Sequence, residues 1–273
     1  MTVFFRALGE KGQKMNKNLT RKLTESAIMI ALSTILSLIP VVSLPFGGSV
    51  TALSMLPIVI IAYRHGTAWG TLTAFAHALL QMLFGLNNLA YATSPLAAVA
   101  IIFLDYILAF TVIGLSGIFA KAIPDRAVSI SLGAFLTCAL RFVCHTISGC
   151  TVWAGVSIPT EEGLYYSLSY NSAYMIPETI LTVIGAYAIS TAFDLKSHPI
   201  KRAQYNDRIG LLGIFSIAVG VMINTLAVFF SIQNADGWNI QNLKNINAPL
   251  VIITSIIAIL LTIVSILLKR KKK

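Results

Sequence analysis

Long apolar runs with few charged side chains constrain this fold more than any other feature. Of the 273 residues, 56% are hydrophobic and only 11% are charged. Helices built from such runs are long enough to cross the roughly 30 Å hydrocarbon core of a bilayer. Inside lipid, a segment must satisfy its own backbone hydrogen bonds, and an α-helix does so. The sequence therefore predicts an all-α membrane protein.

Turn residues rich in glycine, proline and asparagine divide the chain into eight apolar segments. We predict membrane helices at about 24–40, 50–63, 67–84, 96–120, 127–156, 167–192, 209–231 and 248–268. The domain organisation that follows is a basic tail (1–22), a six-helix substrate-binding domain (23–193), a polar linker (194–208) and two further helices with a basic end (209–273).

The placement of positive charge orients these helices. With the amino terminus inside, 18 of the 20 Lys and Arg residues lie on the cytosolic side, and the exceptions are Arg141 and Lys244. Because cytosolic segments carry the excess of Lys and Arg, both termini are predicted to be cytosolic in a multi-pass plasma-membrane protein. The net charge is +10. We expect the basic residues on the cytosolic side to contact lipid headgroups, and we expect no nucleic-acid partner.

Polar and aromatic residues gather between positions 141 and 178, within two otherwise apolar helices. His145 and Trp153 are expected on one face of the first helix, and Asn171 lies near the outer end of the second. Asp105 and Tyr106, from an earlier helix, are expected at a similar depth, roughly 15 Å below the outer surface. Such groups are costly in lipid and usually face a cavity or one another. We predict a pocket for a small organic cation in the outer half of the membrane.

The residue types indicate the kind of ligand. Asp105 supplies negative charge, while His145 and Asn171 can donate and accept hydrogen bonds. Aromatic rings, which attract a cation by about 1–2 kcal/mol when water is excluded, come from Tyr106, Trp153, Tyr166 and Tyr170. A flat, positively charged heterocycle fits this set. The alternative is a purely structural ion pair between Asp105 and Arg141.

Other motifs limit the chemistry. Cys138, Cys144 and Cys150 have no zinc-like spacing and are interpreted as core residues. No GxxxxGK[ST] loop is present to cradle ATP phosphates, so active uptake must draw energy from another subunit. His77 and Glu178 are expected to pack or pair within the bundle. We expect no enzyme activity, no cofactor and no metal.

Taken together, these segments resemble the thiamine-specific substrate-binding (S) components of energy-coupling-factor (ECF) transporters, the ThiT family. The resemblance covers about residues 20–195. It is carried, in chain order, by the Ala27/Ala31 pair, Ser54-Met55-Leu56-Pro57, Arg64-His65-Gly66, residues 104–110, residues 141–145 with Ser148-Gly149, Trp153, and residues 166–178.

The resemblance implies a six-helix S-component bundle with two additional C-terminal transmembrane helices. It implies ligand contacts, with Trp153 stacking on a ring, for Asp105, Tyr106, His145, Trp153, Tyr166 and Asn171. Ala27 and Ala31 match the alanine face that docks on a transmembrane coupling subunit, whose module includes two ATPase subunits. The implied function is a high-affinity thiamine-binding subunit of an ATP-driven vitamin uptake transporter.

Two departures from the family leave alternatives open. The outer loop near 40–49, which is expected to act as a lid, lacks the family's tryptophan, and Phe46 takes its place. Asp105 is also shorter than the glutamate of the family. The alternative functions are binding of a thiamine precursor or analogue, and self-sufficient secondary transport of a small organic cation.

Overall fold

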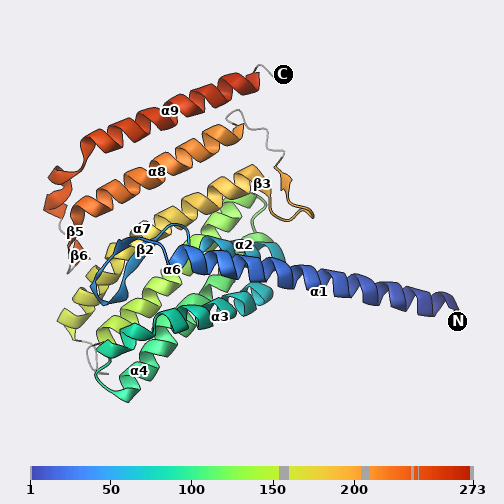
Figure 1. Cartoon of the computed structure of the whole chain (residues 1–273), viewed down its shortest axis with the longest axis horizontal. Helices are drawn as coiled ribbons and strands as arrows, with labels where there is room; N and C mark the ends of the chain where they lie inside the picture. The colour runs from blue at the N-terminus through green and yellow to red at the C-terminus, as the bar shows by residue number, and fades with distance from the viewer. Residues whose placement is uncertain (1, 154–159, 204–209, 235–236, 239, 271–273) are drawn as a thin grey trace.

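The computed structural model describes residues 2–153, 160–203, 210–234, 237–238 and 240–270 (Figure 1). Its α-helices are α1 (Thr2–Ser37), α2 (Leu56–His65), α3 (Thr67–Phe84), α4 (Pro95–Ile101), α5 (Ala109–Thr111), α6 (Arg126–Thr151), α7 (Glu161–Ala192), α8 (Gly210–Ile232) and α9 (Ala248–Arg270). Tighter or wider turns form η1 (Pro45–Gly47), η2 (Leu86–Tyr91), η3 (Ile102–Leu108), η4 (Val112–Ala120) and η5 (Ile240–Asn245). The predicted all-α architecture is confirmed.

Three short antiparallel hairpins connect the helices. They pair β1 (Pro40–Ser43) with β2 (Ser49–Thr51), β3 (Phe193–Asp194) with β4 (Lys201–Arg202), and β5 (Gln233–Asn234) with β6 (Gly237–Trp238). The first hairpin replaces the tight loop expected after the first helix. It opposes Val42 to Val50, and both side chains are buried.

Within the described residues, five helical stretches are long and apolar enough to cross a membrane: Pro95–Ala120, Arg126–Thr151, Glu161–Ala192, Leu211–Ile232 and Ala248–Leu268. The chain is therefore a multi-pass membrane protein. The predicted crossing at 50–63 is wrong as a single helix, because α2 has 10 residues and spans only about 15 Å. Instead, α2 fills the bundle centre, where residues 56–63 are all buried.

Two further helix starts differ from the prediction. The segment expected at about 24–40 belongs to α1, which already begins at Thr2. The segment expected at about 167–192 begins at Glu161, because the Thr160 hydroxyl oxygen accepts a hydrogen bond from Gly163 N at 3.0 Å. This N-cap, with two glutamates in the first turn, stabilises six extra residues of helix.

The helix predicted at 127–156 ends early. α6 stops at Thr151, and residues 154–156 lie outside the described residues. Trp153 N bonds Ser148 O at 3.2 Å, so the chain is already turning away at that point. The expectation that Trp153 shares a helix face with His145 is therefore wrong, although the two still converge on one carboxylate.

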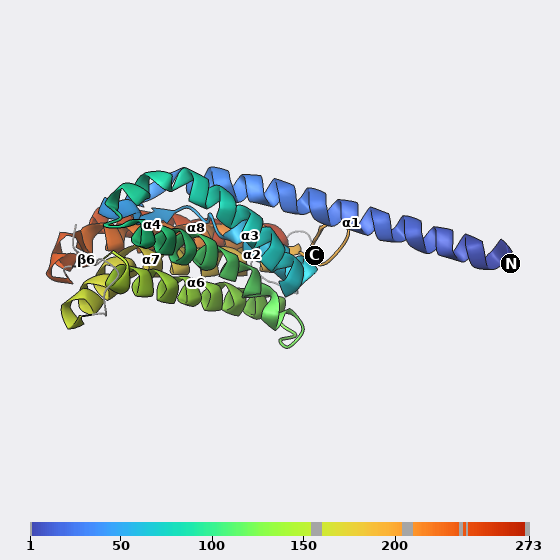
Figure 2. The same ribbon diagram turned by 90° about the horizontal axis from the view of Figure 1, so that it is seen from below.

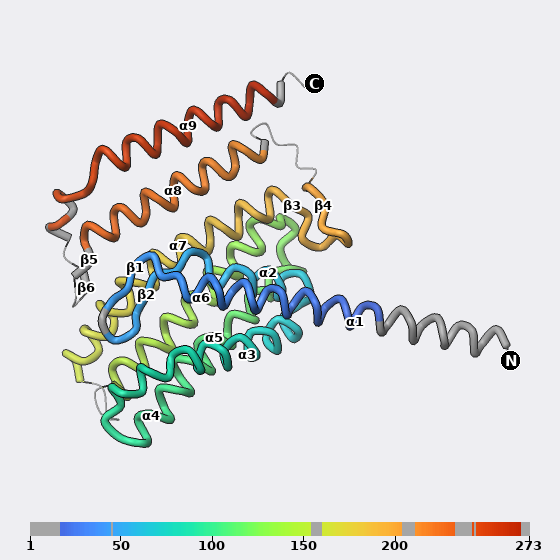
Figure 3. Tube along the Cα trace, in the orientation of Figure 1, coloured from blue at the N-terminus to red at the C-terminus, as the bar shows by residue number. Residues whose placement is uncertain are grey.

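The bundle is layered, with α9, α8 and α7 side by side along one edge (Figure 1). The view from below shows α6 beneath this layer, next to α7 (Figure 2). The Cα trace shows the β1–β2 hairpin beside α7, at the end of the bundle away from β3 and β4 (Figure 3). This arrangement places the hairpin above the space between α3, α6 and α7.

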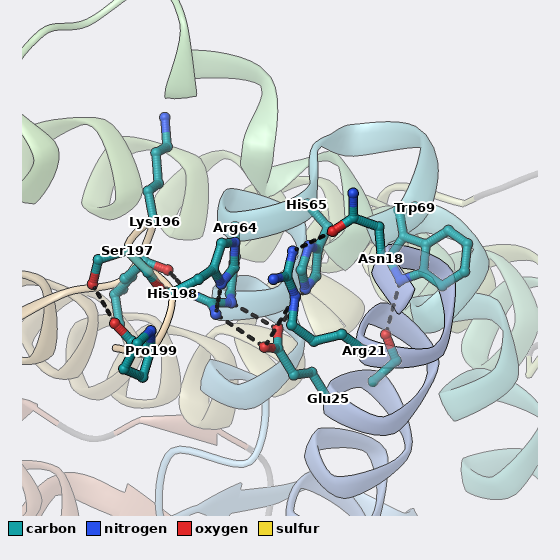
Figure 4. Close-up of polar contacts among 12 residues, drawn as sticks. Asn18, Arg21, Glu25, Arg64, His65, Trp69, Lys196, Ser197, His198 and Pro199 are labelled. Atoms are coloured by element: carbon teal, nitrogen blue, oxygen red, sulfur yellow. Dashed lines mark hydrogen bonds and ion pairs between the residues drawn. The ribbon is translucent and has the colours of Figure 1, made fainter. Parts of the chain in front are cut away.

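A charged cluster closes the opposite end of the bundle (Figure 4). Arg64 donates to both carboxylate oxygens of Glu25, at 2.7 and 2.9 Å, and His65 Nε2 lies 2.7 Å from the same carboxylate. Arg64 also donates to the carbonyls of Leu195 and Ser197. This cluster ties α1, the end of α2 and the start of the linker together.

His198, in the linker, completes this cluster through its ring Nδ1, which lies 2.5 Å from an Arg64 nitrogen. Loss of hydration around the ring and the positive charge of Arg64 lower the pKa of His198. The neutral ring is the form whose Nδ1 can accept a hydrogen bond from the guanidinium.

Candidate functional site

A cavity of about 480 Å³ lies beneath the β1–β2 hairpin, a size typical of small-molecule sites. Its walls come from the end of α1, the hairpin, α3, η3, α6 and α7. All six residues predicted to contact a ligand line it: Asp105, Tyr106, His145, Trp153, Tyr166 and Asn171. The structure thus brings together side chains from three separate segments.

The Asp105 carboxylate is the hub of the polar wall. Ser148 Oγ donates to Asp105 Oδ2 at 2.6 Å, and Trp153 Nε1 donates to the same oxygen at 3.1 Å. His145 Nδ1 lies 2.8 Å from Oδ1. The structure therefore brings Asp105, His145 and Trp153 into direct contact. Among the described residues, no Lys or Arg forms an ion pair with Asp105, whose partner is His145.

His145 is left with one open hydrogen-bonding position. A carboxylate only accepts hydrogen bonds, so His145 Nδ1 carries the hydrogen that Asp105 Oδ1 receives. The other ring nitrogen, Nε2, is buried and has no hydrogen-bond partner among the residues that the structure describes. In the neutral ring this atom is a hydrogen-bond acceptor, and His145 itself lines the cavity.

Asp105 and Tyr106 both face the cavity because the helix widens there. Residues 102–108 form a π-helix, η3, between α4 and α5. Such π-bulges are rare and are frequent at functional sites. Tyr106 donates its hydroxyl hydrogen to Gly85 O at 3.0 Å and accepts from Asn88 Nδ2 at 2.8 Å. Tyr106, which follows Asp105 on this widened turn, thus bonds to the segment between α3 and α4.

The α7 wall supplies an amide and stacked aromatic rings. Tyr166 and Tyr170 lie parallel, with ring centroids 6.2 Å apart and 12° between the planes. Asn171 Nδ2 donates to Ser167 O at 2.8 Å, and Asn171 Oδ1 accepts from the Tyr174 hydroxyl at 2.6 Å. The amide of Asn171 is therefore fixed in orientation at the cavity wall.

The hairpin forms a roof over the cavity, with Phe46 at its tip. The Phe46 ring lies edge-on to Tyr91 at 5.5 Å and to Tyr170 at 6.3 Å. Gly48 N donates to the Tyr170 hydroxyl at 3.0 Å. A Cβ at Gly48 would sit 2.6 Å from that hydroxyl oxygen and 2.9 Å from a Tyr174 ring carbon. Only glycine allows this close approach of the roof to α7.

The alternative pairing of Asp105 with Arg141 is not formed among the described residues. Arg141 is buried on α6, where its guanidinium carbon lies 4.4 Å from the centre of the Phe110 ring. Its NH1 group donates to the Met55 sulfur at 2.6 Å. Asp105 pairs with His145 instead, which leaves its charge available to a ligand.

His77 packs within the bundle as expected, whereas Glu178, which was expected to lie deeper than the pocket, is part of the cavity wall. His77 is buried and lies 3.2 Å from Ser33 Oγ. Glu178 lines the deep end of the cavity, where the Thr51 hydroxyl donates to it at 2.6 Å and the Ser54 hydroxyl at 3.3 Å. The three cysteines are free and buried. The described residues contain no cluster of metal-ligating side chains.

Several lining residues were not predicted from the sequence to contact a ligand. They are Ser37, Thr51, Ser54, Gln81 and Asn88. Each is a single small or amide side chain, and they come from a helix end, a strand, a helix interior and turns, so they form no common sequence pattern. Only the closure of the β1–β2 hairpin over the bundle makes them part of one cavity, and no sequence pattern announces that closure.

Comparison with known proteins decides the family. The family described as "Thiamine transporter protein (Thia_YuaJ)" matches residues 23–196. This chain belongs to that family. The thiamine transporter ThiT of Bacillus subtilis (strain 168) is 36% identical over 180 residues, which cover 62% of this chain and 89% of that protein. The predicted resemblance to the ThiT family of S components is confirmed.

A solved structure, that of ThiT from Listeria monocytogenes, has the same fold. It superposes with a TM-score of 0.51 at 24% identity, over 67% of this chain and 97% of the solved chain. The family match ends at residue 196, so α8 and α9 lie outside it. Because the relatives are transporters, the membership favours transport over the chemistry of a membrane enzyme.

Proposed function

We propose that this protein is the high-affinity thiamine-binding subunit of an ECF-type vitamin uptake transporter. The observation that carries the proposal is the Asp105 carboxylate, which faces an aromatic-walled cavity without a Lys or Arg partner among the described residues. Thiamine is an organic cation with flat rings. The proposal is supported by membership in a family of thiamine transporters.

Each lining group has a role in this proposal. Asp105 faces the positive charge, and Trp153 stacks on a ring of the ligand. His145 Nε2 and Asn171 bond the amino group and ring nitrogens. Tyr106 and Tyr166 complete the walls of the cavity. Phe46, at the tip of the roof, covers the bound ligand as the lid.

The outer face of α1 supports the proposed docking surface. Ala27 and Ala31 are exposed, while Ser26 and Ser33, on another side of the helix, are buried. Small residues on an exposed membrane helix allow another helix to approach closely. In the proposal, this face docks on a transmembrane coupling subunit that carries two ATPases. Both termini are cytosolic, and the cavity opens outward.

The ligand assignment is tested by titrating the purified protein with thiamine. Trp153 donates to Asp105 beside the proposed ligand, so its fluorescence is expected to be quenched on binding. The same titration with thiamine precursors ranks the alternatives. Unchanged fluorescence combined with no heat of binding in calorimetry would refute thiamine as the ligand. Tighter binding of a precursor would assign the cavity to that compound instead.

The docking assignment is tested by replacing both Ala27 and Ala31 with leucine. Thiamine binding is expected to persist, whereas uptake by cells that contain the ECF module is abolished. Ala76→Leu is the matched control, because Ala76 is an exposed alanine on a different helix, α3. Uptake driven by an ion gradient in liposomes without ATPase subunits would support a secondary transporter and contradict the proposal.

A further inference from the structure

The roof hairpin is attached to α7 through an apolar cluster, here called the roof cluster. Its buried members are Val42 and Val50 from the hairpin, and Tyr174, Met175 and Leu181 from α7. These five side chains are at most 8% exposed, so the hairpin and the helix move together only while this packing holds. The stability of the roof therefore depends on what supports the cluster from behind.

α8 supplies part of that support. Met222 and Leu226 of α8 pack against the roof cluster. They are four residues apart, so they lie on the same face of the helix. Figure 1 shows α8 running alongside α7. The family match stops at residue 196, and α8 is thus an addition to the family fold that packs against the cluster by which the roof hairpin is attached to α7.

The roof cluster is directly connected to residues that face the ligand. The Tyr174 hydroxyl donates to Asn171 Oδ1 at 2.6 Å. On the next turn of α7, the Tyr170 hydroxyl accepts from Gly48 N of the hairpin at 3.0 Å. The Tyr174 ring packs edge-on against the Tyr170 ring, with centroids 5.8 Å apart, so Tyr174 contacts both Asn171 and the residue that bonds the roof.

α8 is itself held firmly by α9. Asn224 donates from Nδ2 to Ser255 Oγ at 2.9 Å and accepts at Oδ1 from Thr254 Oγ1 at 2.6 Å. Hydrogen bonds of this kind join helices in a medium where water does not compete. Farther along, a Cβ at Gly220 would lie 2.8 Å from the Ala258 Cβ, so the backbones approach closely. α8 and α9 thus form a stiff two-helix unit.

We propose that this two-helix unit, α8–α9, is a brace that holds the roof hairpin closed over the cavity and slows release of the ligand. Met222 and Leu226 are the positioning residues through which the brace acts. Neither lines the cavity, so their effect is on the roof and not on ligand contacts. The effect on ligand release rests on the proposed thiamine-binding function, whereas the effect on the roof does not.

The experiment uses the full chain with Met222→Ala and, separately, Leu226→Ala. In the ligand-free protein, hydrogen–deuterium exchange of residues 40–51 is expected to rise about tenfold, while exchange in α3 stays at the wild-type rate. With thiamine, stopped-flow fluorescence is expected to show about fivefold faster dissociation and an unchanged association rate constant. Met222→Leu, which keeps most of the side-chain volume, is expected to show the wild-type rates of hydrogen exchange and of thiamine dissociation.

Val221→Ala is the matched control, because Val221 neighbours Met222 in sequence but is 43% exposed. It is expected to behave as the wild type. Wild-type exchange of residues 40–51 in both alanine variants would overturn the proposal, and so would equal acceleration throughout the bundle. If the wild type bound no thiamine, the proposed function would fail, while the exchange measurement would still decide whether α8 braces the roof.

Discussion

Two carboxylates at opposite ends of this bundle differ in how their charge is satisfied. Glu25 bonds both oxygens to Arg64, and His65 Nε2 lies 2.7 Å away. Asp105 has about the same number of contacts, but they come from a serine hydroxyl, an indole and a histidine ring. Among the residues that the structure describes, only the first carboxylate has a guanidinium beside it.

The difference separates a structural anion from one that is available to a ligand. A carboxylate removed from water requires a cation close by, or it is costly. Glu25 finds its cation on α2, and the pair ties α1 to the linker (Figure 4). Asp105 is oriented by three donors and opens into a cavity. Its missing cation is the one that we assign to the ligand.

Among the variants that test this difference between the two carboxylates, Asp105→Asn is expected to have the largest effect on ligand binding. The change keeps the side-chain shape but removes the charge that faces the ligand cation. We expect the thiamine dissociation constant to rise about 100-fold, as for loss of one partner of a buried charge pair, measured by calorimetry. Asp105→Glu is the control and is expected to retain binding. An affinity of Asp105→Asn within threefold of the wild type would contradict the assignment.

The converse change, Glu25→Gln, should affect stability and leave binding alone. It deprives Arg64 and His65 of their anion, and Arg64 is only 3% exposed at its side chain. Unpairing a largely buried charge is destabilising, so we expect the melting temperature in detergent to fall by about 5 °C. Lys121→Gln, which removes one charge at an exposed position, is the control. A weakened thiamine affinity would show that the two ends are not separable.

Gly48→Ala tests the roof that encloses Asp105. The added methyl would lie within 3 Å of both Tyr170 and Tyr174, so the hairpin must move away from α7. We expect thiamine to dissociate about tenfold faster in stopped-flow measurements, a change of roughly 1.4 kcal/mol. Ser43→Ala, at an exposed position of the same hairpin, should dissociate at the wild-type rate. The same rate in both variants would exclude a role for the roof.

Ser148→Ala is expected to have the smallest effect. It removes one of the two donors to Asp105 Oδ2 and leaves Trp153 Nε1. The loss of one hydrogen bond costs about 1 kcal/mol, or roughly fivefold in the thiamine dissociation constant measured by fluorescence. Ser116→Ala, at a buried serine outside the cavity, provides the reference. If Ser148→Ala raised the dissociation constant more than Asp105→Asn does, the orientation of the Asp105 side chain would matter more for binding than its charge.

The sequence predicts the convergence of Asp105, His145 and Trp153 because helical rise fixes depth in a membrane. Three features were not predictable by that reasoning. Regular helix geometry gives no hint of the π-helix at 102–108. The apolar run that begins at residue 50 hides the β2 strand, whose pairing with β1 depends on tertiary packing. The turn at 152–153 depends on how α6 meets the segment after it.

The packing of α8 is another feature that the sequence does not predict. Its apolar sequence predicts a membrane helix, and the observed bounds, Gly210–Ile232, agree within about one residue with the predicted 209–231. Nothing in that pattern indicates which neighbour the helix packs on. Only the packing of Met222 and Leu226 on the roof cluster reveals the contact.

The most direct test of the central claim compares thiamine with an uncharged analogue of the same shape, whose thiazolium is replaced by a neutral ring. Calorimetry on the wild type and on Asp105→Asn gives four dissociation constants. If Asp105 binds the ligand's charge, the wild type prefers thiamine by about 100-fold, and Asp105→Asn shows little preference. An equal preference for thiamine in both proteins would contradict the account.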